Sequence, residues 1–244
     1  MKNTPVIGKM YHITTNRGVF MYRDYTQARN KSWEILIKSG ITQLPVNLKA
    51  VAKYLNVSII PYSRLGNNVF SDKMAAGDGF TTALLDGKKL VFINDIKNMR
   101  RMRFTLAHEL GHVALNHKLD PIAHRNTEFD EGLTPDEMQA NVFARDILMP
   151  ACVLAKLKVN TADEISRLCN VSSTSASIRM ERMKILYQRN KFGLHPLERQ
   201  VLENFDGVVP NNMKDLMSLA GVGRKSANVV MLEVFDDAQG IAVD

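Results

Sequence analysis

The chain has 244 residues, a formal net charge of +7 and 45% hydrophobic residues, which argues against wholesale disorder and allows one large domain or two small ones. No apolar run has the length of a membrane span, and the N-terminus lacks the apolar region of a signal peptide, so we expect a cytoplasmic protein without a membrane partner. Cys152 and Cys169 form no disulfide or zinc framework and are expected to be buried thiols.

The first part of the chain predicts an extension, two helices and a strand. Residues 1–24 show no clear periodicity and are interpreted as an N-terminal extension with one strand. Apolar residues recur at helical spacing over residues 25–39, and a short helix is predicted at 48–55. The β-branched run at 57–62 is typical of a strand.

A β-hairpin is predicted at residues 80–93, where two apolar runs flank Asp86-Gly87, a pair typical of a type I′ turn. A small sheet would then lead into the next helix, which Asn94 or Asn98 can cap. An exposed edge of that sheet can take up an extended segment of another protein as an added strand, or the hairpin can simply cover the helix. The sequence alone leaves both roles open.

The segment AHELGHVALNH, residues 107–117, places the pattern H-E-x-x-H in an apolar helix. His108 and His112 lie one turn apart on the same helical face, so both imidazoles can reach one metal ion, with Glu109 beside them as a base. Structural zinc sites usually close all four positions with cysteines, which are too few here, so a catalytic site with three protein ligands is favoured. The alternative is two ordinary histidines on an amphipathic helix.

The third ligand does not follow from this helix. His117 lies five residues beyond His112, about 140° further round at 3.6 residues per turn, so we expect it to face away from the metal as a helix-end residue. Residues 134–150 predict a second helix, with Thr134 as its N-cap. Glu137 in its first turn is a candidate ligand, and the alternative is that Glu137 only completes a capping box.

These two segments together resemble the ImmA/IrrE family of zinc metallopeptidases, whose motif is H-E-L-G-H followed by E-x-x-A-N-x-F-A-x-x-L-L-x-P. The resemblance extends over about residues 25–205. It implies that His108, His112 and Glu137 bind Zn²⁺ and that Glu109 is the catalytic acid/base. It also implies a narrow protein substrate, a helix-turn-helix repressor of the phage-repressor type, whose cleavage releases its target genes in response to stress or mobile-element induction.

The chain departs from the ImmA/IrrE pattern at Gln139, where many members carry a second acidic residue, which leaves Glu137 as the motif's only suitable carboxylate. We expect an α+β fold, with a zincin-like peptidase domain at residues 25–155 whose small β-sheet packs on the H-E-x-x-H helix. The alternative to a zinc endopeptidase is a regulatory module that binds a repressor or DNA without cutting. The intact Glu109 argues against that alternative, because a binding module needs no base.

A helical region is expected at residues 156–205. Two helices around Asn170-Val171-Ser172 have the arrangement of a helix-turn-helix, which would place Arg179 and Arg182 near DNA. The second helix continues beyond the length of a typical recognition helix. Packing on the peptidase core is therefore the favoured interpretation.

The acidic tail, residues 206–244, fits a helix-hairpin-helix, in which a Gly-x-Gly turn opens the second helix. Gly221, Gly223 and Lys225 are candidates for weak, non-specific contact with a DNA phosphate. From LAGVGRKSANVV to IAVD the tail resembles the endonuclease III family of DNA glycosylases, which implies that Lys225 is a nucleophile assisted by Asp244. The iron–sulfur region and the preceding helical domain of that family do not match this chain, so we interpret the tail as a glycosylase fragment fused to a peptidase. A truncated DNA glycosylase fusion is the remaining hypothesis.

Overall fold

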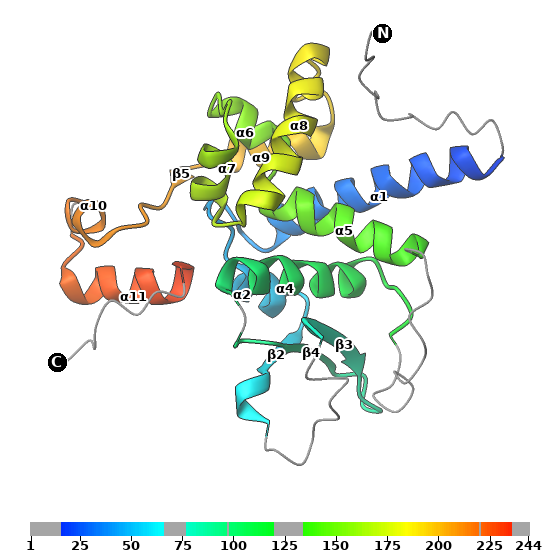
Figure 1. Cartoon of the computed structure of the whole chain (residues 1–244), viewed down its shortest axis with the longest axis horizontal. Helices are drawn as coiled ribbons and strands as arrows, with labels where there is room; N and C mark the ends of the chain where they lie inside the picture. Colours follow the sequence, from blue (N-terminus) through cyan, green and yellow to red (C-terminus); the bar gives the residue numbers. More distant parts are fainter. Residues whose placement is uncertain (1–15, 66–76, 97, 120–133, 220, 236–244) are drawn as a thin grey trace, which may run out of the picture.

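The structure is a computed structural model that describes residues 16–65, 77–96, 98–119, 134–219 and 221–235 (Figure 1). Within these ranges no helix is long and apolar enough to cross a membrane. The strands are β1 (Gln43–Leu44), β2 (Val57–Pro61), β3 (Gly79–Ala83), β4 (Lys89–Ile93) and β5 (Gly207–Val208). The helices are α1 (Asn16–Lys38), α2 (Leu48–Tyr54), the 3₁₀ helix η1 (Tyr62–Arg64), α4 (Met99–Ala114), α5 (Pro135–Leu148), α6 (Ala151–Lys156), α7 (Ala162–Cys169), α8 (Ser173–Arg189), α9 (Pro196–Asn204), α10 (Met213–Met217) and α11 (Arg224–Phe235).

The main sheet has three strands in the order β2-β4-β3, so β3 forms one edge. β2 and β4 run parallel, whereas β3 and β4 form the predicted antiparallel hairpin. Side chains alternate between the faces of a strand. One face, which includes Val91 and Ile93, joins the core under α4, and the other face forms a separate aromatic cluster with Phe80 and Phe92. The mixed helix-and-sheet composition expected from the sequence is thus confirmed.

The turn between β3 and β4 differs from the predicted type I′ turn. The N–H of Leu84 donates to the carbonyl oxygen of Lys88, and the N–H of Gly87 donates to that of Leu84, each over 2.9 Å. Gly87 has φ +81°, but Asp86 is not left-handed. A type I′ turn needs two left-handed residues, whereas the three-residue loop observed here needs one, which Gly87 supplies.

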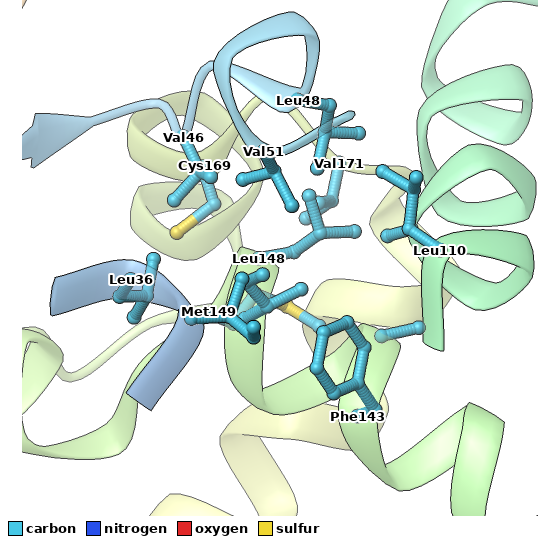
Figure 2. Close-up of a cluster of buried hydrophobic side chains, with 14 of the residues drawn as sticks. Leu36, Val46, Leu48, Val51, Leu110, Phe143, Leu148, Met149, Cys169 and Val171 are labelled. Carbon is cyan, nitrogen blue, oxygen red and sulfur yellow. The ribbon is translucent and has the colours of Figure 1, made fainter. Parts of the chain in front are cut away.

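The core lies where α1, α2, α4 and α5 meet (Figure 2). Leu110 from α4, Phe143 and Leu148 from α5 and Val51 from α2 point into the same interior. Cys169 also lies in this cluster, and Cys152 is a second buried free thiol, as expected. Burial raises the pKa of each thiol to about 12.

A glycine allows the two central helices to approach closely. A Cβ atom added to Gly111 of α4 would lie 3.0 Å from Cδ1 of Phe143 and 3.3 Å from Cα of Ala140. Since Gly111 directly precedes His112, this approach brings the first turns of α5 beside the end of α4 that carries the histidines.

The N-terminal part of the chain differs from its prediction. Helix α1 begins at Asn16 rather than near Tyr25, so residues 16–24 are helical and not an extension with a strand. The sequence of residues 16–24 has no clear apolar repeat, and such a repeat is the main signal by which a helix is recognised in a sequence. Residues 1–15 lie outside the described residues.

Helices α7 and α8 pack on the core, as the favoured interpretation predicts. Asn170 ends α7 in the left-handed conformation, and Met180 and Met183 of α8 belong to the main core cluster. Placing Arg179 near DNA was wrong, because its side chain is 1% exposed and donates a hydrogen bond from Nη2 to Oδ1 of Asp146 over 2.8 Å. Arg179 therefore joins α8 to α5.

The tail has a small core of its own, formed by α10 and α11. It contains Leu216, Ala227, Met231 and Phe235. Just before it, β5 pairs in parallel with β1, with Gln43 opposite Gly207. This pairing of two-residue strands ties the start of the tail to the segment that follows α1.

Candidate metal centre

Both helices of the candidate site begin with a side-chain cap. Asn98 caps α4, since its Oδ1 accepts a hydrogen bond from an N–H of the first turn, which decides between the two predicted caps. α4 then carries His108 and His112 on its last two turns. Thr134 caps α5 as predicted, and its Oγ1 accepts a hydrogen bond from the N–H of Glu137 over 3.3 Å. The cap thus fixes Glu137 in the first turn of α5.

The structure brings together the three residues that were predicted as metal ligands. Nε2 of His108 lies 3.0 Å from Nε2 of His112 and 3.0 Å from Oε2 of Glu137. Nε2 of His112 lies 3.4 Å from Oε1 of Glu137. In a tetrahedral zinc site with bonds of about 2.0–2.2 Å, ligand atoms lie roughly 3.3–3.6 Å apart. Two imidazoles and one carboxylate at these separations fit an ion of that size.

The contacts within the candidate metal site shift the pKa values of Glu137 and His108. Hydrogen bonds from His108 and His112 hold the pKa of Glu137 well below its usual range. Burial lowers the pKa of His108, but the contacts with Glu137, Glu109 and Asn141 outweigh it, so the pKa is raised overall. Without a metal, Glu137 is therefore ionised and His108 holds a proton more tightly than an isolated histidine does.

Nδ1 of each histidine, on the side of the ring opposite the candidate metal position, also has a partner. Nδ1–H of His108 donates to Oδ1 of Asn141 over 3.0 Å. Nδ1 of His112 lies 3.1 Å from Nδ1 of His117, and Nε2 of His117 lies 3.3 Å from Oε1 of Gln139. If Nε2 of His112 faces a metal, its Nδ1–H donates to His117, which in turn donates to Gln139. Such contacts fix the orientation and tautomer of metal-binding histidines.

His117 was expected to face away from the metal, and it is not one of the three candidate ligands among the described residues, but its ring packs on His112 instead of turning away from it. α4 ends at Ala114, and Asn116 adopts a left-handed conformation with φ +56°, so the helical repeat does not extend to His117. The His117 ring instead lies 5.0 Å from the His112 ring, at an angle of 76°. Asn116 is the sequence signal for this turn, because asparagine tolerates the left-handed conformation at helix ends.

Glu109 lies beside the histidines and contacts the sheet. Its residue is 6% exposed, and Oγ1–H of Thr81 donates to its Oε2 over 2.6 Å. Thr81 belongs to the edge strand β3, so the edge of the sheet and the candidate base are directly connected. Sequence reasoning missed Thr81, because Phe80, Thr81 and Thr82 are all buried and nothing in the strand singles out one of them.

The candidate residues of the tail lie together at a different place. Gly221 is left-handed with φ +78°, Gly223 directly precedes α11, and Lys225 is exposed in its first turn. Figure 1 places α10 and α11 apart from α5 and the main sheet. Asp244 lies outside the described residues.

Two regions of the chain match known families. The model of the peptidase M78 family, described as an IrrE N-terminal-like domain, matches residues 52–181. A helix-hairpin-helix motif matches residues 204–233.

Individual relatives match the same two regions. Uncharacterized immunity region protein 2 of Bacillus phage phi105 is 28% identical over 159 residues, which are 62% of this chain and 93% of the phage protein. Endonuclease III of Synechocystis sp. (strain ATCC 27184 / PCC 6803 / Kazusa) is 48% identical over 46 residues, 19% of this chain and 21% of the enzyme. Endonuclease III of Bacillus subtilis (strain 168) is 39% identical over 59 residues, 24% of this chain and 26% of the enzyme. The chain therefore spans about a quarter or less of these two endonucleases.

Because the IrrE N-terminal-like model covers more than half of the chain, including both histidines of the H-E-x-x-H pattern and Glu137, the chain belongs to the peptidase M78 family.

Proposed function

We propose that the protein is a zinc-dependent endopeptidase of the zincin type, in which His108, His112 and Glu137 hold Zn²⁺ and Glu109 is the catalytic acid/base. The observation that carries this proposal is the convergence of three ligand atoms at separations close to those of a tetrahedral zinc site. Membership of the peptidase M78 family supports it. A set of three protein ligands also leaves a position for water or substrate.

When bound, zinc supplies Lewis-acid polarisation of a peptide carbonyl and acidifies a water molecule. Glu109 is the general acid/base: its carboxylate accepts the proton of the attacking water and passes it to the departing amine. Thr81 donates to Oε2 of this carboxylate and so holds it in one orientation. Asn141 and His117 hold the rings of the two histidines in the same way.

The edge strand β3 lies beside the candidate base. It lies on α4 and carries Thr81, which contacts the candidate base. We propose that an extended segment of the substrate pairs with β3 and thereby places its scissile carbonyl near the metal.

We propose that the substrate is a helix-turn-helix repressor, which the enzyme cuts to release its target genes. Two observations support a role in repressor control: the family, and the likeness to a phage immunity region protein along 93% of that protein's length. The non-cutting regulatory module remains the alternative, and it predicts metal binding without cleavage.

We propose that the tail, residues 206–244, tethers the enzyme weakly to DNA. Gly221 and Gly223 shape the turn before α11, and Lys225 is exposed in its first turn, an arrangement suited to one phosphate. The helix-hairpin-helix match supports this role. Absence of a Lys225-dependent cut in abasic DNA would exclude the glycosylase hypothesis.

The peptidase proposal is tested by zinc content and repressor cleavage, measured on the wild-type chain and on Glu109→Gln. We expect one equivalent of zinc in both proteins and a single cut, in a helix-turn-helix repressor encoded beside the protein, that only the wild type makes. Zinc in both proteins without a cut would favour the regulatory module. No zinc in either protein would contradict the ligand set.

A further inference from the structure

A pocket of about 500 Å³ lies between α1, α5 and α8. Each of these helices contributes one arginine to its lining: Arg29, Arg145 and Arg182. No aspartate or glutamate is among the described residues that line it. A concave site of this size with several guanidinium groups is suited to carboxylate side chains, which arginine binds through paired hydrogen bonds.

Arg29 is held in place by neutral partners. Its Nη2 donates to Oδ1 of Asn30 over 3.0 Å, and the carbon of its guanidinium lies 4.7 Å from the centroid of the Trp33 ring. Neither partner carries a negative charge, so the charge of Arg29 acts on whatever enters the pocket. Arg182 of α8 also lines the pocket, and its residue is exposed.

Arg145 and Arg179 donate hydrogen bonds to the same carboxylate, that of Asp146. Arg145 donates to Oδ2 of Asp146, and the buried Arg179 donates to Oδ1 of the same residue. Burial opposes the charge of Asp146, but the two guanidinium groups keep the pKa of this carboxyl lowered, so it is ionised. One carboxylate between two guanidinium groups leaves a net positive charge. Arg145 carries that charge to the pocket, since its side chain is 32% exposed and that of Arg179 is buried.

The pocket and the candidate metal centre share one side chain. Asn141 lines the pocket, and its Oδ1 accepts the hydrogen bond from His108. Met138, Asn141 and Arg145 follow one stripe of α5, at spacings of three and four residues, beginning next to Glu137. An extended peptide advances about 3.3 Å per residue, so a substrate cut at the metal has side chains within reach of this stripe a few residues away.

We propose that Arg29, Arg145 and Arg182 bind an acidic side chain of the protein substrate, a few residues from the bond that is cut. The proposal rests on the peptidase function proposed above and adds a substrate class, peptides with aspartate or glutamate near the scissile bond. Pocket shape favours protein over nucleic acid, because duplex DNA presents a long row of phosphates and binds an extended basic face. A pocket of this volume between three helices instead receives single side chains.

The test uses fluorescein-labelled hexaglutamate and hexaglutamine, titrated with the zinc-loaded full chain and followed by fluorescence anisotropy. We expect the chain to bind hexaglutamate more tightly than hexaglutamine, and Arg29→Gln/Arg182→Gln to weaken hexaglutamate binding by roughly tenfold or more. Arg145 is left intact because it contacts Asp146. Arg167→Gln/Arg189→Gln is the matched control, since it removes the same charge from exposed positions on α7 and α8 and is expected to change binding by less than about twofold.

Circular dichroism checks that the variants fold, and the exposed single variant Arg182→Glu replaces the pocket pair if that pair does not. Equal weakening by the pocket pair and the control pair would overturn the proposal, because net charge alone would then explain binding. The proposal would also be overturned if the pocket pair lost binding of a labelled DNA duplex and kept hexaglutamate binding.

The same preparations separate this proposal from the peptidase function. One outcome would overturn the pocket proposal alone: the chain binds zinc and makes a Glu109-dependent cut, but replacing the pocket arginines does not change hexaglutamate binding. Arginine-dependent hexaglutamate binding by a chain that holds no zinc would contradict the peptidase, while the pocket would keep its preference for acidic peptides.

Discussion

Nδ1 of His112 lies 3.1 Å from Nδ1 of His117, and Nε2 of His112 points to Glu137. His117 is therefore expected to orient His112 for metal binding, although it is not itself one of the three ligands. Replacing His117 by Phe keeps an aromatic ring but removes the acceptor, so we expect zinc affinity to fall by about 10–100-fold, measured by competition with a chromophoric chelator. His117→Gln, which keeps an acceptor oxygen, should retain more affinity. Equal zinc affinity in the wild type and His117→Phe would show that the contact does not matter for the metal.

Thr81 is expected to act on the reaction and not on metal binding. It donates a 2.6 Å hydrogen bond to the Glu109 carboxylate, and Thr81→Val removes this donor with little change of volume. We expect kcat for repressor cleavage to fall by about tenfold or more, with zinc content unchanged, because the base loses its fixed orientation. Thr82→Val, at the neighbouring buried position on the opposite face of β3, is the control. A loss of kcat that is the same in both variants would point to general damage of the strand.

Zinc affinity should depend on pH through His108. Zinc requires neutral imidazoles, and the pKa of His108 is raised in the metal-free protein, so affinity is expected to be complete above this raised pKa and to fall as the pH drops through it. Glu137, whose pKa is lowered, stays ionised in that window and contributes no further loss. Competition titrations from about pH 5.5 to 8 measure this dependence, with NMR titration of His108 in the metal-free chain as the reference. An affinity that stays flat across the His108 titration would contradict the prediction.

Local signals in the sequence predicted the parts of the site that lie on helices. The i,i+4 spacing of His108 and His112 gives their common face, and Thr134 marks the start of α5. Spacing alone left Glu137 undecided between capping and metal binding. The resemblance of the motif pointed to metal binding, and the structure places the Glu137 carboxylate beside both histidines.

Contacts between residues far apart in the sequence could not be predicted from the sequence pattern. Thr81 meets Glu109 across 28 positions of the chain, and Arg179 is buried only because Asp146 of another helix compensates its charge. His117 was misplaced because a single left-handed residue, Asn116, breaks the helical repeat. The partners of Thr81 and Arg179 thus lie on distant segments, whereas the signal for the turn before His117 is local.

Gly111 of α4 should not tolerate a larger residue, because α5 lies directly against it. A Cβ at this position would come within 3.0 Å of the Phe143 ring and 3.3 Å of the Ala140 backbone, and the backbone cannot move aside without shifting α5. We expect Gly111→Ala to lower the free energy of unfolding by about 1–3 kcal/mol, the usual cost of overpacking, and to weaken zinc binding as Glu137 moves away from the histidines. Urea denaturation of the metal-free chain measures the first effect and chelator competition the second. Gly223→Ala is the matched control, since a Cβ there meets nothing within 4 Å. A chain that loses neither stability nor zinc affinity on Gly111→Ala would show that the close approach of α4 and α5 is not what holds Glu137 at the site.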